Sequence, residues 1–261
     1  MNDKPLKDKA TATGKPATLC PASYPLGSRL SRAAARSLLD ARRVQEAQGA
    51  AIQDTWDRIA QPIASWDSGP LLWLTKYTKS EDTHWLTKGA TYKSHFPGRD
   101  ERPDFLTIME YLLTKPGVLI TKSREMMATW LVCGYISWFC QFHPVFWIAQ
   151  SGRQEKAAEM VDYARILYNN QEDWLKRKNP LTVDNYMELQ WANGARMLAV
   201  PSGESQVRMY HPYGYFQDES AFLPEAQEAH DAVRPVCKQF IAVSTDNVPS
   251  WFHQQTRLEA S

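Results

Sequence analysis

The sequence lacks the features of membrane, secreted and metal-clustered proteins. No apolar run reaches the roughly 18 residues that a membrane-spanning helix needs, and the N-terminus lacks the apolar core of a signal peptide. The four cysteines form no Cys-x-x-Cys pair, and three of them lie in apolar segments, which argues against both zinc and disulfides. We therefore expect a soluble intracellular protein with reduced thiols and no membrane partner.

A strong excess of charge of one sign is also missing. The net charge is +1, so the composition alone gives no case for nucleic-acid binding, and any such contact would be a local patch. Apolar residues make up 43% of the 261 residues and include ten tryptophans, which is enough for a large buried core. The length fits one large domain, or a domain with an appendage.

The acidic and histidine residues form no clear metal-ligand pattern. Glu81, Asp82 and His84 are close in sequence, but their spacing matches no known set of ligands. A polar loop is the favoured interpretation of this segment.

One more absence concerns residues 117–131, where an apolar run, a short polar turn and an apolar helical pattern follow one another. Strand, turn and helix are the layout of a phosphate-binding loop, but the usual G-x-x-x-x-G-K-[ST] pattern is not present. Lys122 and Met127 stand at the two glycine positions, Ala128 stands at the lysine position, and only Thr129 fits. A buried strand followed by a core helix is the alternative.

The organisation of the chain is predicted from its patterns. Residues 1–30 lack periodicity and are expected to be a disordered tail. Residues 31–62 are expected to form a helical arm, with a helix from Ser31 to Ile59 and Pro62 ending it. The arm either docks a partner or packs on its own domain, and the second is favoured. Residues 63–261 are expected to form the main domain.

Within the main domain, strand and helix patterns alternate, which favours a parallel sheet covered on both faces. Asn193-Gly194 is a strong hairpin signal between two alternating runs. The expected helices cover residues 105–113, 127–142, 157–167 and 224–233, and the expected strands cover residues 118–121, 145–149, 186–191, 196–200, 213–217 and 240–244.

Two acids, Asp218 and Glu219, follow the apolar strand at 213–217. In an open α/β sheet, ligands bind beyond the carboxyl ends of the strands. Asp218 there would hold Mg²⁺, and Glu219 would accept a proton from an attacking water. A solvated pair of acids at a strand end is the alternative, but the strand-turn-helix ending in Thr129 favours nucleotide hydrolysis.

Four segments together resemble the ATPase domain of the large terminase subunits of tailed phages, the motors that drive DNA into procapsids. They are KSREMMAT (122–129), NGARMLAVPSGESQVR (193–208), YGYFQDESAF (213–222) and FIAVSTDNVPSWFHQ (240–254). The resemblance covers roughly residues 71–254. Some members of that family carry the loop lysine at the front of the motif, where Lys122 stands. A long ammonium acts as a point charge and can approach phosphates from another side of the loop.

The resemblance implies a role for each matching residue. Glu219 would activate water, and Arg208, eleven residues earlier, would be an arginine finger offered to a neighbouring subunit. Thr129 and Asp218 would hold Mg²⁺. The residues implied to contact ATP are Lys122, Ser123, Arg124, Glu125, Met126, Met127, Ala128, Thr129, Ser244 and Thr245, the last two as sensors of the γ-phosphate.

The resemblance also implies a fold and partners. The expected fold class is α/β, a three-layer RecA-like sheet of the ASCE P-loop ATPase type, mainly parallel, with helices on both faces and a helical N-terminal arm. The implied partners are double-stranded DNA, a portal protein, a small terminase subunit and further copies in a ring, pentameric in the family. The implied location is the cytoplasm of an infected bacterial host.

The chain departs from the family in two ways. Methionines replace the glycine that lets the loop close tightly on phosphate, so nucleotide affinity could be low. The RNase H-like nuclease domain with which the family continues is not contained in this chain, and we expect no DNA cleavage from these residues. The rival interpretations are another RecA-like helicase or translocase, against which Ala128 argues, and a catalytically weak nucleotide-binding assembly scaffold, against which the Asp218-Glu219 pair argues.

Overall fold

The computed structural model describes residues 32–80, 94–124, 126–245 and 249–259. The predicted tail at 1–30, the segment with Glu81, Asp82 and His84, and the loop residue Glu125 lie outside the described residues. The chain divides into two compact units, residues 1–49 and residues 50–261. The predicted domain boundary at residue 62 stays a prediction. None of the described helices has the length and apolar character that crossing a membrane would require.

The predicted N-terminal helix is present as α1 (Arg32–Ile59). Its last turn is held within the second unit, where Ile59 is fully buried. The indole Nε1 of Trp138 donates a 2.7 Å hydrogen bond to the carbonyl oxygen of Ile59, and the rings of Trp56 and Phe142 lie 4.6 Å apart. These contacts stabilise the end of the helix because a terminal carbonyl that has no partner in its own helix receives one from the core.

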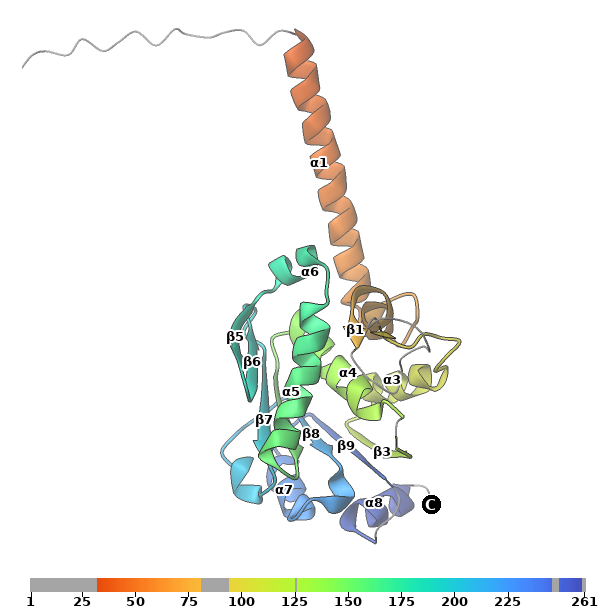
Figure 1. Cartoon of the computed structure of the whole chain (residues 1–261), viewed down its shortest axis with the longest axis vertical. Helices are drawn as coiled ribbons and strands as arrows, with labels where there is room; N and C mark the ends of the chain where they lie inside the picture. Colours follow the sequence, from red (N-terminus) through yellow and green to blue (C-terminus); the bar gives the residue numbers. More distant parts are fainter. Residues whose placement is uncertain (1–31, 81–93, 125, 246–248, 260–261) are drawn as a thin grey trace, which may run out of the picture. The chain divides into compact units, whose positions relative to one another are not determined.

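A seven-stranded sheet forms the centre of the second unit (Figure 1). Its strand order is β3-β9-β8-β4-β7-β6-β5. The first five of these strands run parallel; β6 then pairs antiparallel with β7, and β5 pairs antiparallel with β6. The bounds are β3 (Gly117–Lys122), β9 (Gln239–Thr245), β8 (Gly214–Asp218), β4 (Phe146–Ser151), β7 (Arg196–Pro201), β6 (Glu188–Trp191) and β5 (Leu181–Asn185). The predicted mainly parallel α/β sheet is confirmed.

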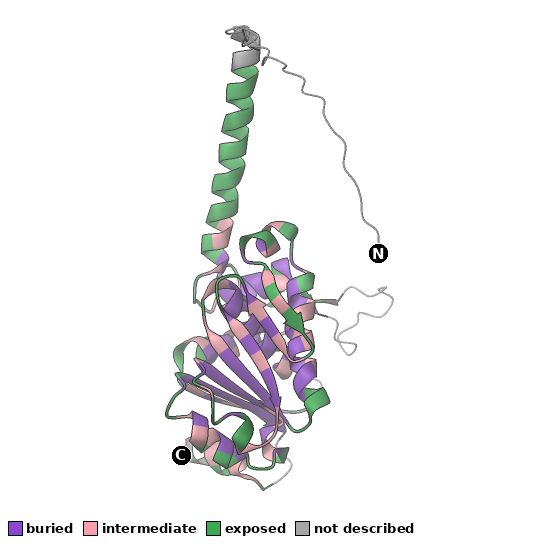
Figure 2. Ribbon diagram, turned by 90° about the vertical axis from the view of Figure 1, so that its left-hand side faces the viewer, coloured by how far each residue is buried: buried purple, intermediate pink, exposed green. Residues whose placement is uncertain are grey.

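Alternate residues of the central strands belong to two separate hydrophobic cores, because successive side chains of a strand point to opposite faces. Trp147 and Phe216 pack in the first core with α3 (Asp104–Thr114), α4 (Ala128–Phe142) and α5 (Gln154–Asn169). Their neighbours Ile148 and Tyr215 pack in the second core with α7 (Ala226–Val233) and α8 (Trp251–Glu259). The strands between the helices are largely buried (Figure 2). The second unit therefore has three layers, as predicted.

The most apolar helix of the sequence, α4, is buried on nearly all sides, as its composition predicts. The close packing of β8 depends on a glycine at its first position. A Cβ atom at Gly214 would lie 2.4 Å from the ring of Trp147 on the neighbouring strand β4, and only glycine allows that approach.

Several elements have no counterpart in the sequence predictions. They are α2 (Gly69–Leu72), the π-helix η1 (Trp73–Tyr77), β1 (Lys79–Ser80), β2 (Ser94–His95), α6 (Asp173–Lys178), β5, the 3₁₀ helices η3 (Glu204–Gln206) and η4 (Ser220–Phe222), and α8. Most are short, and their sequences carry no clear period. The helix predicted to open at Pro224 begins two residues later, at Ala226.

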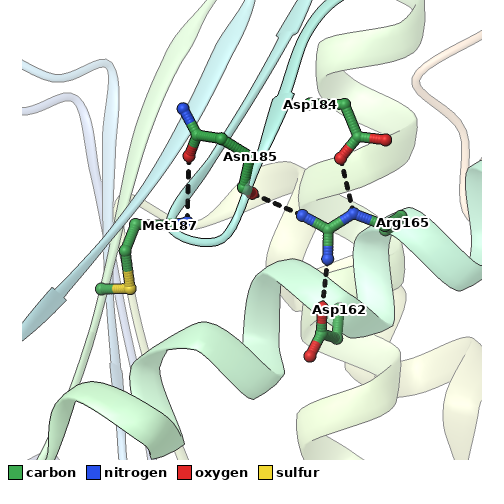
Figure 3. A network of polar contacts seen from close by, with 5 residues as sticks. All are labelled: Asp162, Arg165, Asp184, Asn185 and Met187. Atoms are coloured by element: carbon green, nitrogen blue, oxygen red, sulfur yellow. Dashed lines mark hydrogen bonds and ion pairs between the residues drawn. The ribbon is translucent and has the colours of Figure 1, made fainter.

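The strand β5 is held at the edge of the sheet by an arginine on α5 (Figure 3). Arg165 pairs with Asp162 on its own helix and donates from Nε to Asp184 Oδ1 at 2.6 Å. It also donates to the carbonyl oxygen of Asn185, whose side chain accepts the backbone N–H of Met187 at 3.0 Å. One charged side chain thus fixes both β5 and its turn into β6.

Candidate nucleotide-binding site

The parallel strands bring the predicted site residues to one edge of the sheet. Strand β3 ends at Lys122, β8 ends at Asp218, and β9 lies between them and ends at Thr245. Lys122 is paired in register with Thr245, and Asp218 is paired with Val243. Carboxyl ends of parallel strands are where open α/β sheets bind ligands.

The first contact across this edge joins Lys122 to Glu219. The Nζ atom of Lys122 lies 3.0 Å from Oε1 of Glu219, although the residues are 97 positions apart in the chain. The lysine side chain is 14% exposed and the glutamate side chain is 39% exposed. The lysine is therefore held largely inside the edge, while the carboxylate is open to solvent.

The second contact joins Thr129, in the first turn of α4, to Asp218. The hydroxyl of Thr129 donates a 2.9 Å hydrogen bond to Oδ1 of Asp218. Burial raises the pKa of Asp218 to about 6; nearby Lys122 and the Thr129 hydrogen bond act to lower it, and the charge of Glu219 acts to raise it. Asp218 is thus an acid whose charge has too little compensation in its surroundings.

The chemistry of this pair fits Mg²⁺. A hydroxyl and a carboxylate are hard oxygen ligands, and Mg²⁺ is commonly held by one or two protein oxygens together with phosphate oxygens and water. A cation beside Asp218 would also supply the charge compensation that its raised pKa shows to be incomplete. In the part of the chain that the structure describes, no group of three or more His, Cys, Asp or Glu residues could hold a metal by itself.

The loop between β3 and α4 contains a backbone conformation that glycine usually adopts, but the residue there is a methionine. Met127 has φ 53°, in the left-handed region, and caps the N-terminus of α4. Its side chain is buried, as is that of Ala128, whereas Ser123, Arg124 and Met126 are exposed. Left-handed backbone is unfavourable for a residue with a Cβ atom and persists only where neighbouring contacts hold it.

One such contact comes from Arg102, which the sequence reasoning missed. Its guanidinium donates to the carbonyl oxygen of Met126, and it holds Asp104 with two parallel hydrogen bonds of 2.9 and 2.6 Å. The same group lies over the ring of Phe105, 4.2 Å from its centre. Nothing in the sequence distinguishes Arg102 from the nearby Arg99, because its partner is 24 residues away.

The backbone at Glu219 is also left-handed, with φ 52°. Two buried hydroxyls hold the turn η4 that follows it. The Oγ of Ser244 accepts the backbone N–H of Ala221 at 3.1 Å, and the Oγ of Ser220 donates to Oε1 of Gln217 at 2.8 Å. Ser244, predicted to sense the γ-phosphate, is therefore linked directly to the turn that carries Glu219.

Arg208 lies at the surface, outside the contacts described above. It follows η3 on the loop after β7, its side chain is 68% exposed, and its guanidinium pairs with Glu204. Within the described residues it makes no hydrogen bond or ion pair with Lys122, Thr129, Asp218 or Glu219. The structure thus brings together the predicted lysine, threonine and both acids, and leaves the predicted arginine at the surface.

The fold and these paired side chains define an α/β protein with a RecA-like sheet and a strand-loop-helix at its carboxyl edge. In structure the chain is similar to the large terminase of bacteriophage HK97, with a TM-score of 0.50 and 11% identity over 67% of this chain and 36% of that chain. It is also similar to a mutant of the large terminase ATPase domain of Thermus phage P74-26, with a TM-score of 0.47, 10% identity and coverages of 57% and 67%. No known protein family and no curated protein matches the sequence.

The similarity to the HK97 protein shows the fold, and the predicted RecA-like α/β class is confirmed by it. The chain spans about a third of the length of that terminase, with 36% of it covered. The score for the Thermus phage domain is lower than 0.5, so the fold assignment rests on the HK97 structure. The expected likeness to large terminases thus holds at the level of the fold.

Proposed function

We propose that this chain is the motor domain of a viral DNA-packaging machine, which hydrolyses ATP and moves double-stranded DNA into a procapsid. The observation that carries the proposal is the meeting of two residue pairs at the carboxyl edge of the sheet. Lys122 contacts Glu219 and Thr129 contacts Asp218, over separations of 97 and 89 residues. These are the residue types that phosphoryl transfer uses to bind phosphate, to hold Mg²⁺ and to activate water.

Lys122 would bind the phosphates of ATP in place of a lysine at position 128. An ammonium has three N–H donors, so Lys122 can keep its contact with Glu219 while donating to phosphate oxygens. The backbone of the loop before α4 and the N-terminus of α4 would add N–H donors, which favour anions. Thr129 and Asp218 would hold Mg²⁺, which supplies charge neutralisation on the phosphates when bound.

Glu219 would accept a proton from the water that attacks the γ-phosphate. Its side chain is 39% exposed, so water can reach the carboxylate. A positioned general base contributes roughly 10²–10⁴ in rate. The left-handed backbone at Glu219 and the hydrogen bonds around η4 fix the direction in which the carboxylate points.

Arg208 would act on the site of a neighbouring subunit. Its exposure and its single described ion pair, with Glu204, leave it available to a second copy. Such a finger is worth about 10³–10⁵ in rate, so an isolated chain would be a slow ATPase. Under this proposal the chain works as a ring, pentameric in the large terminases it resembles, on a portal protein and with a small terminase subunit, in the cytoplasm of an infected bacterial host.

The direct test measures Mg²⁺-dependent ATP binding and phosphate release by the purified chain. We expect ATP to raise the melting temperature in the presence of Mg²⁺ and to do so much less after Mg²⁺ is chelated. We expect slow phosphate release, with a rate per chain that rises with protein concentration. Binding without any release, at all protein concentrations, would favour the assembly scaffold over the motor. Absence of binding at millimolar ATP would contradict the proposal.

A further inference from the structure

Four buried polar side chains form one continuous hydrogen-bonded chain behind the candidate site. Ser220 Oγ donates to Gln217 Oε1 at 2.8 Å, and Gln217 Nε2 donates to the hydroxyl of Tyr215 at 2.8 Å. The Tyr215 hydroxyl donates to Gln150 Oε1, and Gln150 Nε2 donates to the carbonyl oxygens of Pro201 and Gly203 at 3.0 and 3.2 Å. We call Ser220, Gln217, Tyr215 and Gln150 the buried relay.

The direction of every bond in the buried relay is the same. Backbone carbonyls fix both glutamine amides. Turning over Gln150 would place its oxygen against the oxygens of Pro201 and Gly203, and turning over Gln217 would place its oxygen against that of Ala226, to which its Nε2 also donates at 3.0 Å. Burial raises the pKa of Tyr215, which keeps its hydroxyl protonated as a donor. The two glutamines are neighbours in register on β4 and β8, and all four side chains are almost fully buried.

The two ends of the buried relay lie at two parts of the proposed machinery. Ser220 directly follows Glu219, in the turn η4. Pro201 and Gly203 form the base of the loop that carries Arg208, whose backbone N–H bonds to Glu204 at 3.2 Å. The carboxylate of Glu225, at the start of α7, also accepts the backbone N–H of Glu204 at 3.0 Å, so this loop is tied down at a second point.

The position of the buried relay is costly for a purely structural element. Tyr215 belongs to the second hydrophobic core, with Ile148, and Gln150 and Gln217 lie on the same sheet face, because residues two apart on a strand point the same way. Apolar residues would pack there without the desolvation that polar groups require. A fully satisfied polar chain in such a place defines one arrangement, because breaking any bond leaves buried groups without partners.

We propose that the buried relay couples the position of the Arg208 loop to the position of Glu219, so that docking of a neighbouring subunit on Arg208 is sensed at the general base of the same chain. This inference rests on the proposed function. If the loop base moves so that Gln150 loses its hydrogen bond to Pro201 or Gly203, the side chains of Tyr215 and Gln217 would shift in turn, and the turn η4 would shift with them. Gln150, Tyr215, Gln217 and Ser220 are then positioning residues, with no contact to the nucleotide.

The test combines Tyr215→Phe, which removes the central link, with Arg208→Ala. Tyr135→Phe is the matched control, because Tyr135 is also buried and also donates through its hydroxyl to a glutamine, Gln239, at 2.9 Å. The specific ATPase rate is measured against protein concentration. In the wild type and in Tyr135→Phe, Arg208→Ala is expected to remove most of the concentration-dependent rate. In the Tyr215→Phe background, Arg208→Ala is expected to have about tenfold less effect on the concentration-dependent rate, with ATP affinity unchanged.

Additive effects of Tyr215→Phe and Arg208→Ala would overturn the coupling and leave the buried relay as core structure. Ser220→Ala, a smaller change at the far end, is measured in parallel, because Tyr215→Phe can reduce stability. Amide hydrogen exchange provides a readout that needs no ATPase. Ser220→Ala is expected to speed exchange in residues 203–208 as well as in η4, and Tyr135→Phe is not. Exchange that changes only in η4 would contradict the inference, whatever the outcome of the ATPase tests of the proposed function.

Discussion

The ammonium of Lys122 lies 3.0 Å from the carboxylate of Glu219; Lys122 ends β3 and Glu219 directly follows β8, the two strands that flank β9 in the sheet. The contact places a cation at the front of the loop, where the usual phosphate-loop pattern has a glycine. The position where that pattern has its lysine is Ala128, which is buried in the first turn of α4. The cation at this edge of the sheet is therefore Lys122, and not a residue at position 128.

Asp218→Asn is expected to change the pH dependence of stability. The pKa of Asp218 is raised to about 6 in the folded chain, so the folded state binds more protons than the unfolded state between about pH 4 and 6. Stability is then lost as the pH rises through this window, by at most about 3 kcal/mol. Asn keeps an oxygen for the Thr129 hydroxyl and carries no charge.

The variant is therefore expected to be more stable than the wild type at pH 7.5 and equal to it near pH 4, as measured by urea denaturation at both values. It is also expected to lose the stabilisation by Mg²⁺ and ATP. Asp231→Asn, at an exposed acid on α7, is the control and is expected to change neither property. Equal stability of Asp218→Asn and wild type at pH 7.5 would mean that the carboxylate is better compensated than its burial indicates.

Glu219→Gln is expected to bind ATP and to fail to hydrolyse it. The amide keeps the size of the side chain but cannot take a proton from water, so turnover is expected to fall about 10²–10⁴-fold. ATP affinity and phosphate release are measured on the same preparation. A parallel loss of binding would show that Glu219 holds Lys122 or the loop in place and is not the base.

Arg208→Ala is expected to spare ATP binding and to lower the rate only where copies of the chain meet. Its side chain is exposed and, among the residues that the structure describes, is paired with Glu204 alone, so its removal costs little stability. In mixtures with Glu219→Gln, which retains Arg208 but lacks the base, part of the lost activity is expected to return. Mixtures no more active than their components would contradict an arginine acting between subunits.

Arg102→Ala is expected to weaken nucleotide binding without touching the nucleotide. The guanidinium fixes the carbonyl oxygen of Met126 next to the left-handed Met127, and its side chain is 11% exposed. Its loss is expected to cost about 1–3 kcal/mol of stability and to loosen the loop. Arg99→Ala, at a neighbouring arginine paired with Asp67 over 3.5 Å, is expected to do neither. Thermal melting and ATP titration of both variants separate these outcomes.

Much of the fold follows from local patterns. The apolar β-branched run before Lys122, the Asn193-Gly194 turn and the one-sided stripe of α5 each specify an element through local geometry, and the structure has all three. Strand β5 could not be predicted in this way, because its residues are mostly exposed and its position depends on Arg165 of another element.

The candidate site was only partly accessible from sequence for the same reason. Strand-end residues such as Lys122 and Asp218 follow from the rule that parallel strands end at one edge. Arg102 and the buried relay did not follow, because they depend on contacts across 24 residues at Arg102 and across 51 to 65 residues at Gln150, and their residue types are common in loops and cores. The left-handed backbone at Met127 also runs against local preference, which is typical of a position fixed by its surroundings.

The measurement that tests the central claim most directly is ATP binding by Lys122→Ala in the presence of Mg²⁺. Lys115→Ala, at an exposed lysine just before β3, is the control. We predict that Lys122→Ala lowers ATP affinity at least about tenfold while the folded state survives, and that Lys115→Ala binds as the wild type does. Unchanged affinity in Lys122→Ala would show that the phosphates are bound elsewhere and would contradict the account.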